Sequence, residues 1–213
     1  MKLVRFSVCI ILLIFGFSAK SQINWLSSYE LAKEIAKEQN KLIIVDCWAD
    51  WCGPCLKMDD QVWSNEIIQA YADNFIFVKI DMSSGAPDPN FRADAIPKIF
   101  VTDAWNSQMK NYTGYQSKSK MDIILKSFSF DISDVYTAKK EIENNKKDIA
   151  GCLKLAMIYQ ELSIYLERDA RVPIRYLSVD YFKKAIKESK KGKDLTLNEQ
   201  AIILSCLNKN SKI

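Results

Sequence analysis

Histidine is absent from this 213-residue sequence, and its absence restricts the chemistry that the chain can perform. Histidine is the usual general base near neutral pH and the commonest protein ligand for metal ions. Any catalysis must therefore use cysteine, carboxylate, lysine or tyrosine side chains. The charge is also modest, because 30 Lys+Arg against 26 Asp+Glu leave a net charge of +4, which does not indicate a nucleic-acid partner. The hydrophobic fraction of 48% is that of an ordinary globular protein.

Long apolar runs are missing as well, apart from one near the amino terminus. A positively charged start is followed by an apolar run from Ser7 to Ala19, and Ala19 and Ser21 place small residues two apart, as a signal-peptide cleavage site requires. The alternative, an uncleaved membrane anchor, is disfavoured because a run of about 13 residues is shorter than the ~20 that span a bilayer. We therefore expect residues 1–21 to be a cleaved signal peptide. The protein is then secreted across the inner membrane to the periplasm, without stable membrane insertion after cleavage.

The cysteines that follow this segment are odd in number. They are Cys47, Cys52, Cys55, Cys152 and Cys206. An odd count excludes a framework in which every cysteine is paired within the chain. In an exported protein disulfides persist, so a single pair can be structural, catalytic or both.

Residues 22–130 alternate between strand and helix patterns. Apolar runs predict strands at 41–48, 75–81, 98–102 and 109–113, and periodic patterns predict helices at 27–40, 53–71 and 119–128. Ser27 followed by Glu30 is a capping-box pattern for the first helix, and a break is expected in the second helix near Ser64. Strands and helices in this order predict an α/β sheet that helices cover on both faces.

The character of the chain changes after Asp131. Strand patterns stop, and helical patterns run over 133–144, 149–167, 173–190 and 196–208, with Pro173 expected in a first helical turn. Residues 131–213 hold 16 Lys+Arg and 12 Asp+Glu, whereas residues 22–130 hold 11 and 14. The two parts therefore look like distinct units, with a boundary near residue 131.

Cys52 and Cys55 are separated by two residues, directly after a buried strand and at the start of a helix. Unpaired N–H groups and the helix dipole at a helix N-terminus stabilise a thiolate and lower the pKa of the first cysteine. Cys52 is then the attacking nucleophile, and Cys55, one turn later, is the resolving cysteine. Pro54 fits the first turn, where its missing N–H is not needed, and Gly53 leaves the approach to the sulfur open.

Three other kinds of site share this cysteine spacing. A zinc site needs further ligands, which without histidine could come only from carboxylates or from Cys152 and Cys206, and these two cysteines lie alone in apolar helical stretches. A haem attachment site requires histidine after Cys55, where Leu56 stands. A purely structural disulfide gains little stability from so short a loop. Redox chemistry without a metal or cofactor is the expectation.

The run Ile44–Cys55, which ends in Trp-Cys-Gly-Pro-Cys, resembles the active-site segment of the thioredoxin family. Ala95–Phe100 is similar to that family's cis-proline strand. Lys57–Asp59 and Val62–Ser64 resemble its exported branch, which includes the C-terminal domains of transmembrane disulfide reductases. The resemblance covers about residues 24–129 and implies a thioredoxin-like fold, a central mixed sheet flanked by helices.

We therefore expect three parts: the signal peptide at 1–21, a thioredoxin-like α/β domain at 22–130, and a small all-α C-terminal domain at 131–213. Short stretches of the last part faintly resemble the paired helices of tetratricopeptide repeats. Either a helical cap on the thioredoxin-like domain or a partner-binding module fits that pattern.

The resemblance implies roles for further residues. Asp46 would be the buried carboxylate beneath the cysteines that accepts the proton of Cys55 through water, and burial in an apolar strand should independently raise its pKa. Pro97 would be cis and face the cysteines, with the Ile96 backbone pairing with an extended substrate, and Trp51 would flank the site. Leu56 and Lys98 depart from the family's usual lysine and threonine, which leaves substrate preference open.

The expected function is an exported thiol–disulfide oxidoreductase that reduces disulfides in protein substrates. Such an enzyme requires an upstream electron donor, for which a membrane disulfide reductase is a candidate. Two alternatives remain at this point. The chain is an adaptor whose helices select a partner while the redox site is secondary, or it is a disulfide oxidase or isomerase built on the same fold.

Overall fold

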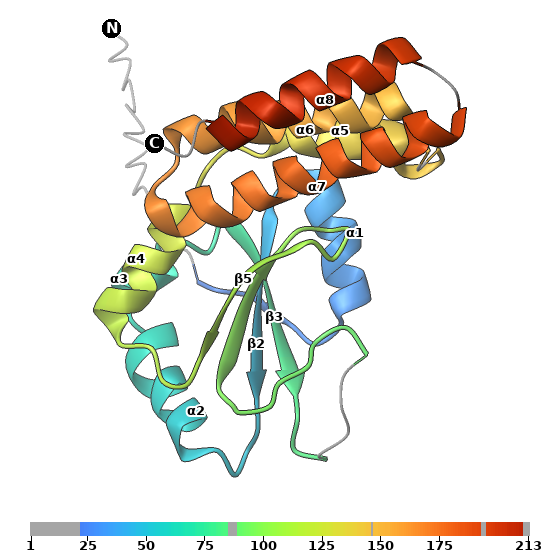
Figure 1. The fold of residues 1–213 in the computed structure, drawn as a ribbon. Helices are drawn as coiled ribbons and strands as arrows, with labels where there is room; N and C mark the ends of the chain where they lie inside the picture. Colours follow the sequence, from blue (N-terminus) through green and yellow to red (C-terminus); the bar gives the residue numbers. More distant parts are fainter. Residues whose placement is uncertain (1–21, 85–88, 146, 193–194, 211–213) are drawn as a thin grey trace, which may run out of the picture.

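Five strands form one mixed sheet in the order β1-β3-β2-β4-β5 (Figure 1). The strands are β1 (Trp25–Leu26), β2 (Leu42–Trp48), β3 (Phe75–Asp81), β4 (Lys98–Thr102) and β5 (Gln108–Thr113). The central strand β2 runs parallel to β3 and antiparallel to β4. This computed structural model describes residues 22–84, 89–145, 147–192 and 195–210. The expected signal peptide, residues 1–21, lies outside the described residues.

Helices cover both faces of the sheet (Figure 1). One face carries α1 (Tyr29–Gln39), and the other carries α2 (Gly53–Met58), the π-helical turn η1 (Asp59–Trp63), α3 (Glu66–Gln69) and α4 (Lys118–Phe128). The expected break near Ser64 is confirmed, since η1 ends before it and Asn65 caps α3. The observed architecture is therefore the predicted one, an α/β sheet that helices cover on both faces.

The central strand β2 delivers the chain to the cysteine motif. Ile43, Ile44 and Val45 are fully buried, because helices pack on both faces of the sheet at this strand. Such a strand is fixed by its neighbours over its whole length. The end of β2 at Trp48 therefore has a fixed position, and the cysteine motif begins directly after it.

Two local expectations for the amino-terminal half were wrong. Ser28, not Ser27, caps α1: its hydroxyl accepts a hydrogen bond from the Leu31 N–H at 3.2 Å. Only Ser27 has a glutamate three residues later, but either serine can cap a helix, and the phase of the helix on the core decides between them. Strand β1 was missed, because a strand of two residues is too short to produce an alternating pattern.

Four further helices form a layer across the end of the sheet opposite α2 (Figure 1). They are α5 (Ser133–Glu143), α6 (Ile149–Tyr165), α7 (Arg168–Gly192) and α8 (Leu195–Asn210). Pro173 lies inside α7 and not in its first turn, which corrects the expected helix start. Ala170 and Ile174 are fully buried on either side of it, and this packing outweighs the backbone hydrogen bond that proline cannot donate.

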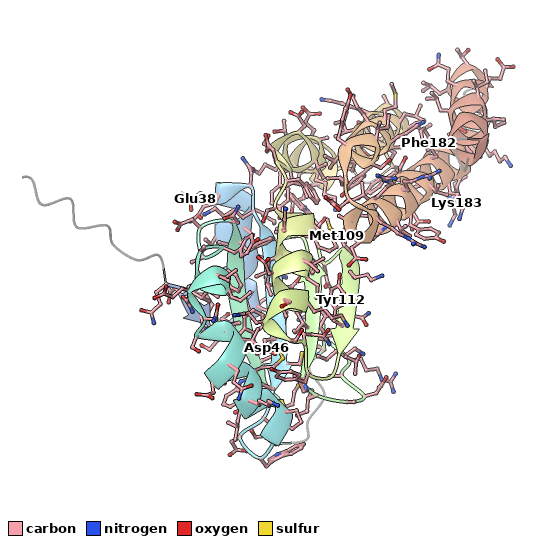
Figure 2. All side chains as sticks on the ribbon, turned by 90° about the vertical axis from the view of Figure 1, so that its left-hand side faces the viewer. Glu38, Asp46, Met109, Tyr112, Phe182 and Lys183 are labelled. Carbon is pink, nitrogen blue, oxygen red and sulfur yellow. A yellow bond between two sulfur atoms is a disulfide. The ribbon has the colours of Figure 1, made fainter. Side chains whose placement is uncertain are left out.

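The inner side of the helical layer, from α5, α6 and the start of α7, shares one hydrophobic core with the sheet, whereas α8 packs in a second cluster with α6 and α7. The Tyr136 hydroxyl of α5 donates to the Lys41 carbonyl at 2.6 Å and accepts from the Ala104 N–H at 3.2 Å. Next to it, the buried Lys139 ammonium pairs with the buried Asp103 carboxylate. The helical region is thus packed as a cap on the sheet. Figure 2 shows Asp46 in the sheet-containing body and Phe182 in the helical layer beyond its end.

None of the described helices combines the length and the apolarity that a membrane crossing requires.

Candidate active site

Cys52 and Cys55 form a disulfide at the N-terminus of α2, with an S–S distance of 2.07 Å and a Cα–Cα distance of 5.2 Å. The chain turns after β2 so that the Cys52 N–H donates to the Ala49 carbonyl at 3.1 Å. Cys52 is the N-cap residue of α2, and its sulfur accepts a hydrogen bond from the Cys55 N–H at 3.2 Å. The Cys55 N–H, which also donates to the Cys52 carbonyl, is therefore placed to stabilise a thiolate on Cys52, together with the dipole of the helix N-terminus.

The two cysteines differ little in exposure, since Cys52 is 4% exposed and Cys55 is 2% exposed. They pack with Ala49 in a small apolar cluster that Trp48 and Ile96 complete. Only a small part of either cysteine is therefore accessible at the molecular surface.

The Ile96–Pro97 peptide bond is cis, as the resemblance implied. Ile96 packs against the cysteine cluster, so the structure brings this distant segment to the disulfide. The Pro97 carbonyl accepts a hydrogen bond from the Gly114 N–H at 2.8 Å. Gly114 has φ = 81°, a left-handed conformation that favours glycine, and it fixes the loop after β5 against the proline.

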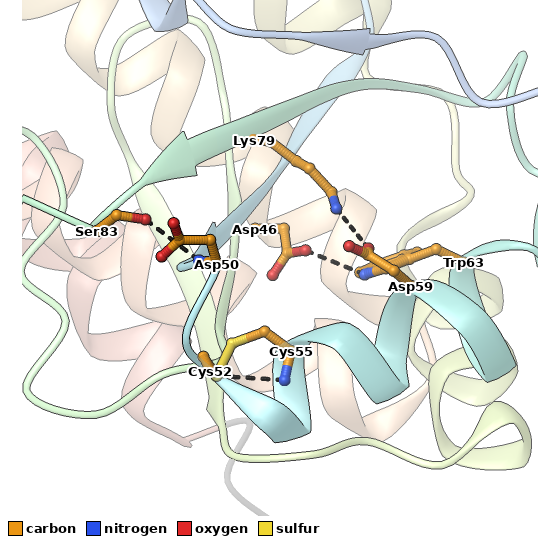
Figure 3. Close-up of a disulfide and its surroundings, with 8 residues drawn as sticks. All are labelled: Asp46, Asp50, Cys52, Cys55, Asp59, Trp63, Lys79 and Ser83. Atoms are coloured by element: carbon orange, nitrogen blue, oxygen red, sulfur yellow. Dashed lines mark hydrogen bonds and ion pairs between the residues drawn. A yellow bond between two sulfur atoms is a disulfide. The ribbon is translucent and has the colours of Figure 1, made fainter.

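Trp51 and Gly53 lie on the outer side of the disulfide. Trp51 is 66% exposed, and its indole N–H reaches the Ser83 carbonyl at 3.5 Å. The Asp50 N–H also donates to the Ser83 hydroxyl, at 3.2 Å, which anchors this segment to the end of β3 (Figure 3). A Cβ placed on Gly53 would meet nothing within 4 Å, so the space beside the motif is open.

Asp46 is buried within β2, and only 2% of it is exposed. One of its carboxyl oxygens accepts a hydrogen bond from the Trp63 indole N–H at 3.1 Å (Figure 3), and the other has no hydrogen-bond partner among the described residues. Loss of solvation raises the pKa of Asp46 from 3.8 to about 7, and the Lys79 ammonium opposes that rise. The expected burial and raised pKa are confirmed.

Sequence reasoning missed the charged surroundings of Asp46. Lys79 of β3 is the register partner of Asp46 in β2, and its ammonium pairs with the Asp59 carboxylate of η1 (Figure 3). The Asp59 charge adds to the rise in the Asp46 pKa. Two signals were available: Lys79 is the only basic residue in its strand, and Asp59 follows Cys55 by one helical turn. Neither signal predicts the contact between Lys79 and Asp59 unless the register of β2 and β3 is known.

Cys47 and Cys152 do not take part in this disulfide. Cys47 is buried in β2, and Cys152 is buried in α6, where loss of solvation raises the pKa of its thiol. The side chain of Cys206 lies outside the described residues. Among the described residues, no three cysteine, aspartate or glutamate side chains gather in a way that could hold a metal ion.

Comparison with known proteins gives a family match over part of the chain. Residues 24–104 match a family model described as thioredoxin-like. Over 105 residues the chain is 23% identical to the thiol:disulfide interchange protein DsbD of Haemophilus influenzae (strain PittEE), covering 46% of this chain and 18% of DsbD. It is 28% identical over 88 residues to the thioredoxin of Alicyclobacillus acidocaldarius, covering 41% of this chain and 81% of that thioredoxin.

A solved structure, the oxidised C-terminal domain of DsbD from Neisseria meningitidis, covers 49% of this chain and 99% of its own length at 18% identity, with a TM-score of 0.43. The chain spans less than a fifth of the length of the DsbD relative that it matches, since 18% of that protein is covered. The family model, the mixed sheet and the cysteine pair agree with one another. Residues 24–104 therefore match a thioredoxin-like family model, and this part of the chain carries the Cys52–Cys55 pair, which supports thiol–disulfide exchange.

Proposed function

We propose that the protein is an exported thiol–disulfide oxidoreductase that reduces disulfides in protein substrates. The observation that supports this most is the position of Cys52, whose sulfur accepts the Cys55 N–H at the first turn of α2. A helix N-terminus stabilises the thiolate, which is the nucleophile of disulfide exchange. Gly-Pro between the cysteines, as in thioredoxin, favours reduction over oxidation by resemblance.

The first step begins from the reduced enzyme. The Cys52 thiolate attacks one sulfur of a substrate disulfide, forms a mixed disulfide with it, and releases the other substrate sulfur as a thiolate. The Cys55 N–H and the dipole of α2 stabilise the charge on Cys52 before the attack. The open space beside Gly53 leaves room for the substrate sulfur to approach.

The second step returns the substrate as a dithiol. Cys55 loses its thiol proton to Asp46, and the resulting thiolate attacks the Cys52 sulfur, which displaces the substrate thiolate. Asp46 suits this role because its pKa of about 7 lets the carboxylate accept a proton and give it back near neutral pH. The enzyme is left with the Cys52–Cys55 disulfide.

The oxidised enzyme must then receive two electrons from a dithiol donor, which attacks the Cys52–Cys55 disulfide by the same chemistry. A membrane disulfide reductase is our candidate for this donor. In this proposal the substrate lies as an extended segment along Ile96 and Pro97, with the exposed Trp51 indole on its other side.

Reduction of insulin in the presence of dithiothreitol tests the proposed activity. The purified protein should accelerate the reaction above dithiothreitol alone, and Cys52→Ser should abolish the acceleration. Cys55→Ser should retain the first step and accumulate a mixed disulfide that mass spectrometry detects. Cys152→Ser, which changes a cysteine buried in α6, is the matched control and should leave the rate unchanged. Acceleration that survives Cys52→Ser would refute the mechanism.

Export is a separate part of the proposal and has its own test. The apolar segment before Gln22 supports it. Cell fractionation with N-terminal sequencing should find the mature chain in the periplasm, starting at Gln22. A cytosolic chain that retains residues 1–21 would overturn the export while leaving the redox chemistry intact.

A further inference from the structure

Helix α6 has almost no charged residues, although it lies at the edge of the molecule. Among its 17 residues only Lys154 and Glu161 are charged, and apolar side chains occur on all sides of the helix. A helix that is apolar all round is normally covered all round. In α6 one face is covered by the helical layer, through Leu155 and Tyr159, and the opposite face is not.

The uncovered face is a continuous stripe along α6, which we call the α6 stripe. Its members recur every three or four residues and so share one side of the helix: Ala150, Lys154, Met157, Glu161 and Ile164. Met157 is 50% exposed and Ile164 is 68% exposed, which is high for large apolar side chains. The stripe thus alternates exposed apolar side chains with the only two charged residues of α6, so it offers both apolar area and ion-pair partners to another protein.

Hollows lie on both sides of the stripe. One of about 420 Å³ is bounded by Leu197 and Gln200 of α8, and one of about 240 Å³ is bounded by Asp134 and Val135 of α5. Both hollows reach Ile158 and Glu161 at the centre of α6. Side chains of a second helix can therefore enter on either side of the stripe.

We propose that the α6 stripe is the contact surface between two copies of this chain. In this dimer α6 packs antiparallel against α6 of the second copy, about a two-fold axis that passes at Met157. A two-fold interface must be complementary to itself, because the same patch supplies both sides.

The sequence of the stripe meets that requirement. Lys154 lies three residues before Met157 and Glu161 lies four residues after it, so an antiparallel pairing places each lysine opposite the glutamate of the other copy. The same pairing places the small Ala150 opposite the large Ile164. Methionine at the axis suits a self-contact, because its flexible side chain adapts to an identical neighbour. The symmetric spacing of opposite charges favours a second copy over an unrelated helix.

Lys154 already contacts Glu141 of α5 at 2.7 Å within the chain. Both side chains are about half exposed, and ion pairs of this kind contribute little. An ammonium group has three N–H donors, so Lys154 can keep Glu141 and also meet the second copy's glutamate.

Sedimentation equilibrium on the purified protein tests the dimer. The 24.5 kDa chain should associate to twice that mass. Glu161→Lys and Lys154→Glu should each weaken the dimer by about tenfold or more, since each places like charges together at two symmetric positions. The double variant Lys154→Glu/Glu161→Lys should restore it. Lys183→Glu, a similarly exposed change on α7, is the control and should have no effect.

Cysteine cross-linking tests the position of the axis. In a Cys52→Ser/Cys55→Ser background, oxidised glutathione should convert two Met157→Cys thiols into one disulfide between chains. Tyr176→Cys, at a 67% exposed position on α7, should cross-link far more slowly. The proposal would be overturned by a protein that stays monomeric at about 1 mM. A dissociation constant of about 1 mM is the weakest that is usually counted as binding. The proposal would also be overturned by a dimer that is indifferent to Glu161→Lys, or by equal cross-linking at both positions. Circular dichroism verifies that every variant is folded.

Discussion

The carboxyl group of Asp46 lies where water does not stabilise its charge. Its burial in β2 favours the protonated form, and the nearby Lys79 ammonium only partly offsets this, so the pKa reaches about 7. A group with this pKa is poised for proton exchange at neutral pH. The same property makes the folded protein sensitive to pH.

Asp46→Asn should stabilise the protein at pH 8. The carboxyl pKa is higher in the folded state, at about 7, than the ordinary aspartate value of 3.8 that applies in the unfolded chain, so folding takes up a proton between these values. The stabilising effect of this proton uptake is present below pH 3.8 and is lost as the pH rises through 7. Asparagine carries no charge, so the variant's free energy of unfolding at pH 8 should exceed that of the parent, by at most about 4 kcal/mol.

Urea unfolding of the oxidised protein at pH 4 and pH 8 measures this difference. At pH 4 the variant and the parent should have nearly equal stability, apart from small packing effects. Equal stability at pH 8 as well would show that Asp46 is solvated in solution.

At the level of single elements, a buried ion pair holds α5 on the sheet. The Lys139 ammonium contacts the Asp103 carboxylate and the Ser107 hydroxyl, and it lies 5.5 Å from the centre of the Trp105 ring. Lys139 and Asp103 are 2% and 0% exposed. In such a setting each charge depends on the other, because water cannot replace the missing partner.

Lys139→Met should therefore destabilise the protein by roughly 3–5 kcal/mol, since it leaves the Asp103 charge buried and uncompensated. Lys140→Met, on the same helix but exposed, is the matched control and should change stability by less than about 0.5 kcal/mol. Chemical denaturation measures both variants. If the two variants were equally stable, the Lys139–Asp103 pair would not hold the helical region in place.

The elements differed in how well the sequence predicted them. Strand β3 was predicted at Phe75–Asp81, with the bounds that the structure has, because a buried strand produces an apolar run, here interrupted only by Lys79. The predicted start of α7 was wrong, because tertiary packing around Pro173 overrides the preference of proline for the first turn of a helix. In the site, the cysteines and Asp46 follow from the motif and from one polar residue in an apolar strand. The Lys79–Asp59 pair depends on strand register and helix phase together, which no local pattern encodes.

Over the whole molecule, helix α2, which Cys52 caps, and the helical layer lie at opposite ends of the sheet (Figure 1). The layer therefore packs on the thioredoxin-like domain far from the disulfide. It does not block the approach to Cys52. The shared core and the Tyr136 and Lys139 contacts indicate that the domain depends on this support.

Deletion of residues 131–213 should unfold the rest of the chain or broaden its unfolding transition, because core residues beneath α5 become exposed. Activity toward a small disulfide and toward insulin should then fall together. Circular dichroism melts and both activity assays measure this. A truncated chain that is folded and active on the small disulfide, but slow on insulin, would instead assign the helices to substrate recruitment.

The redox potential of the Cys52–Cys55 pair tests the proposed reductase most directly. Equilibration of the purified protein with dithiothreitol buffers, followed by thiol quantification, gives this value. Our account predicts a potential near that of thioredoxin, about −270 mV, with which the reduced pair can donate electrons to most substrate disulfides. A potential near that of a strong oxidant, about −120 mV, would contradict it.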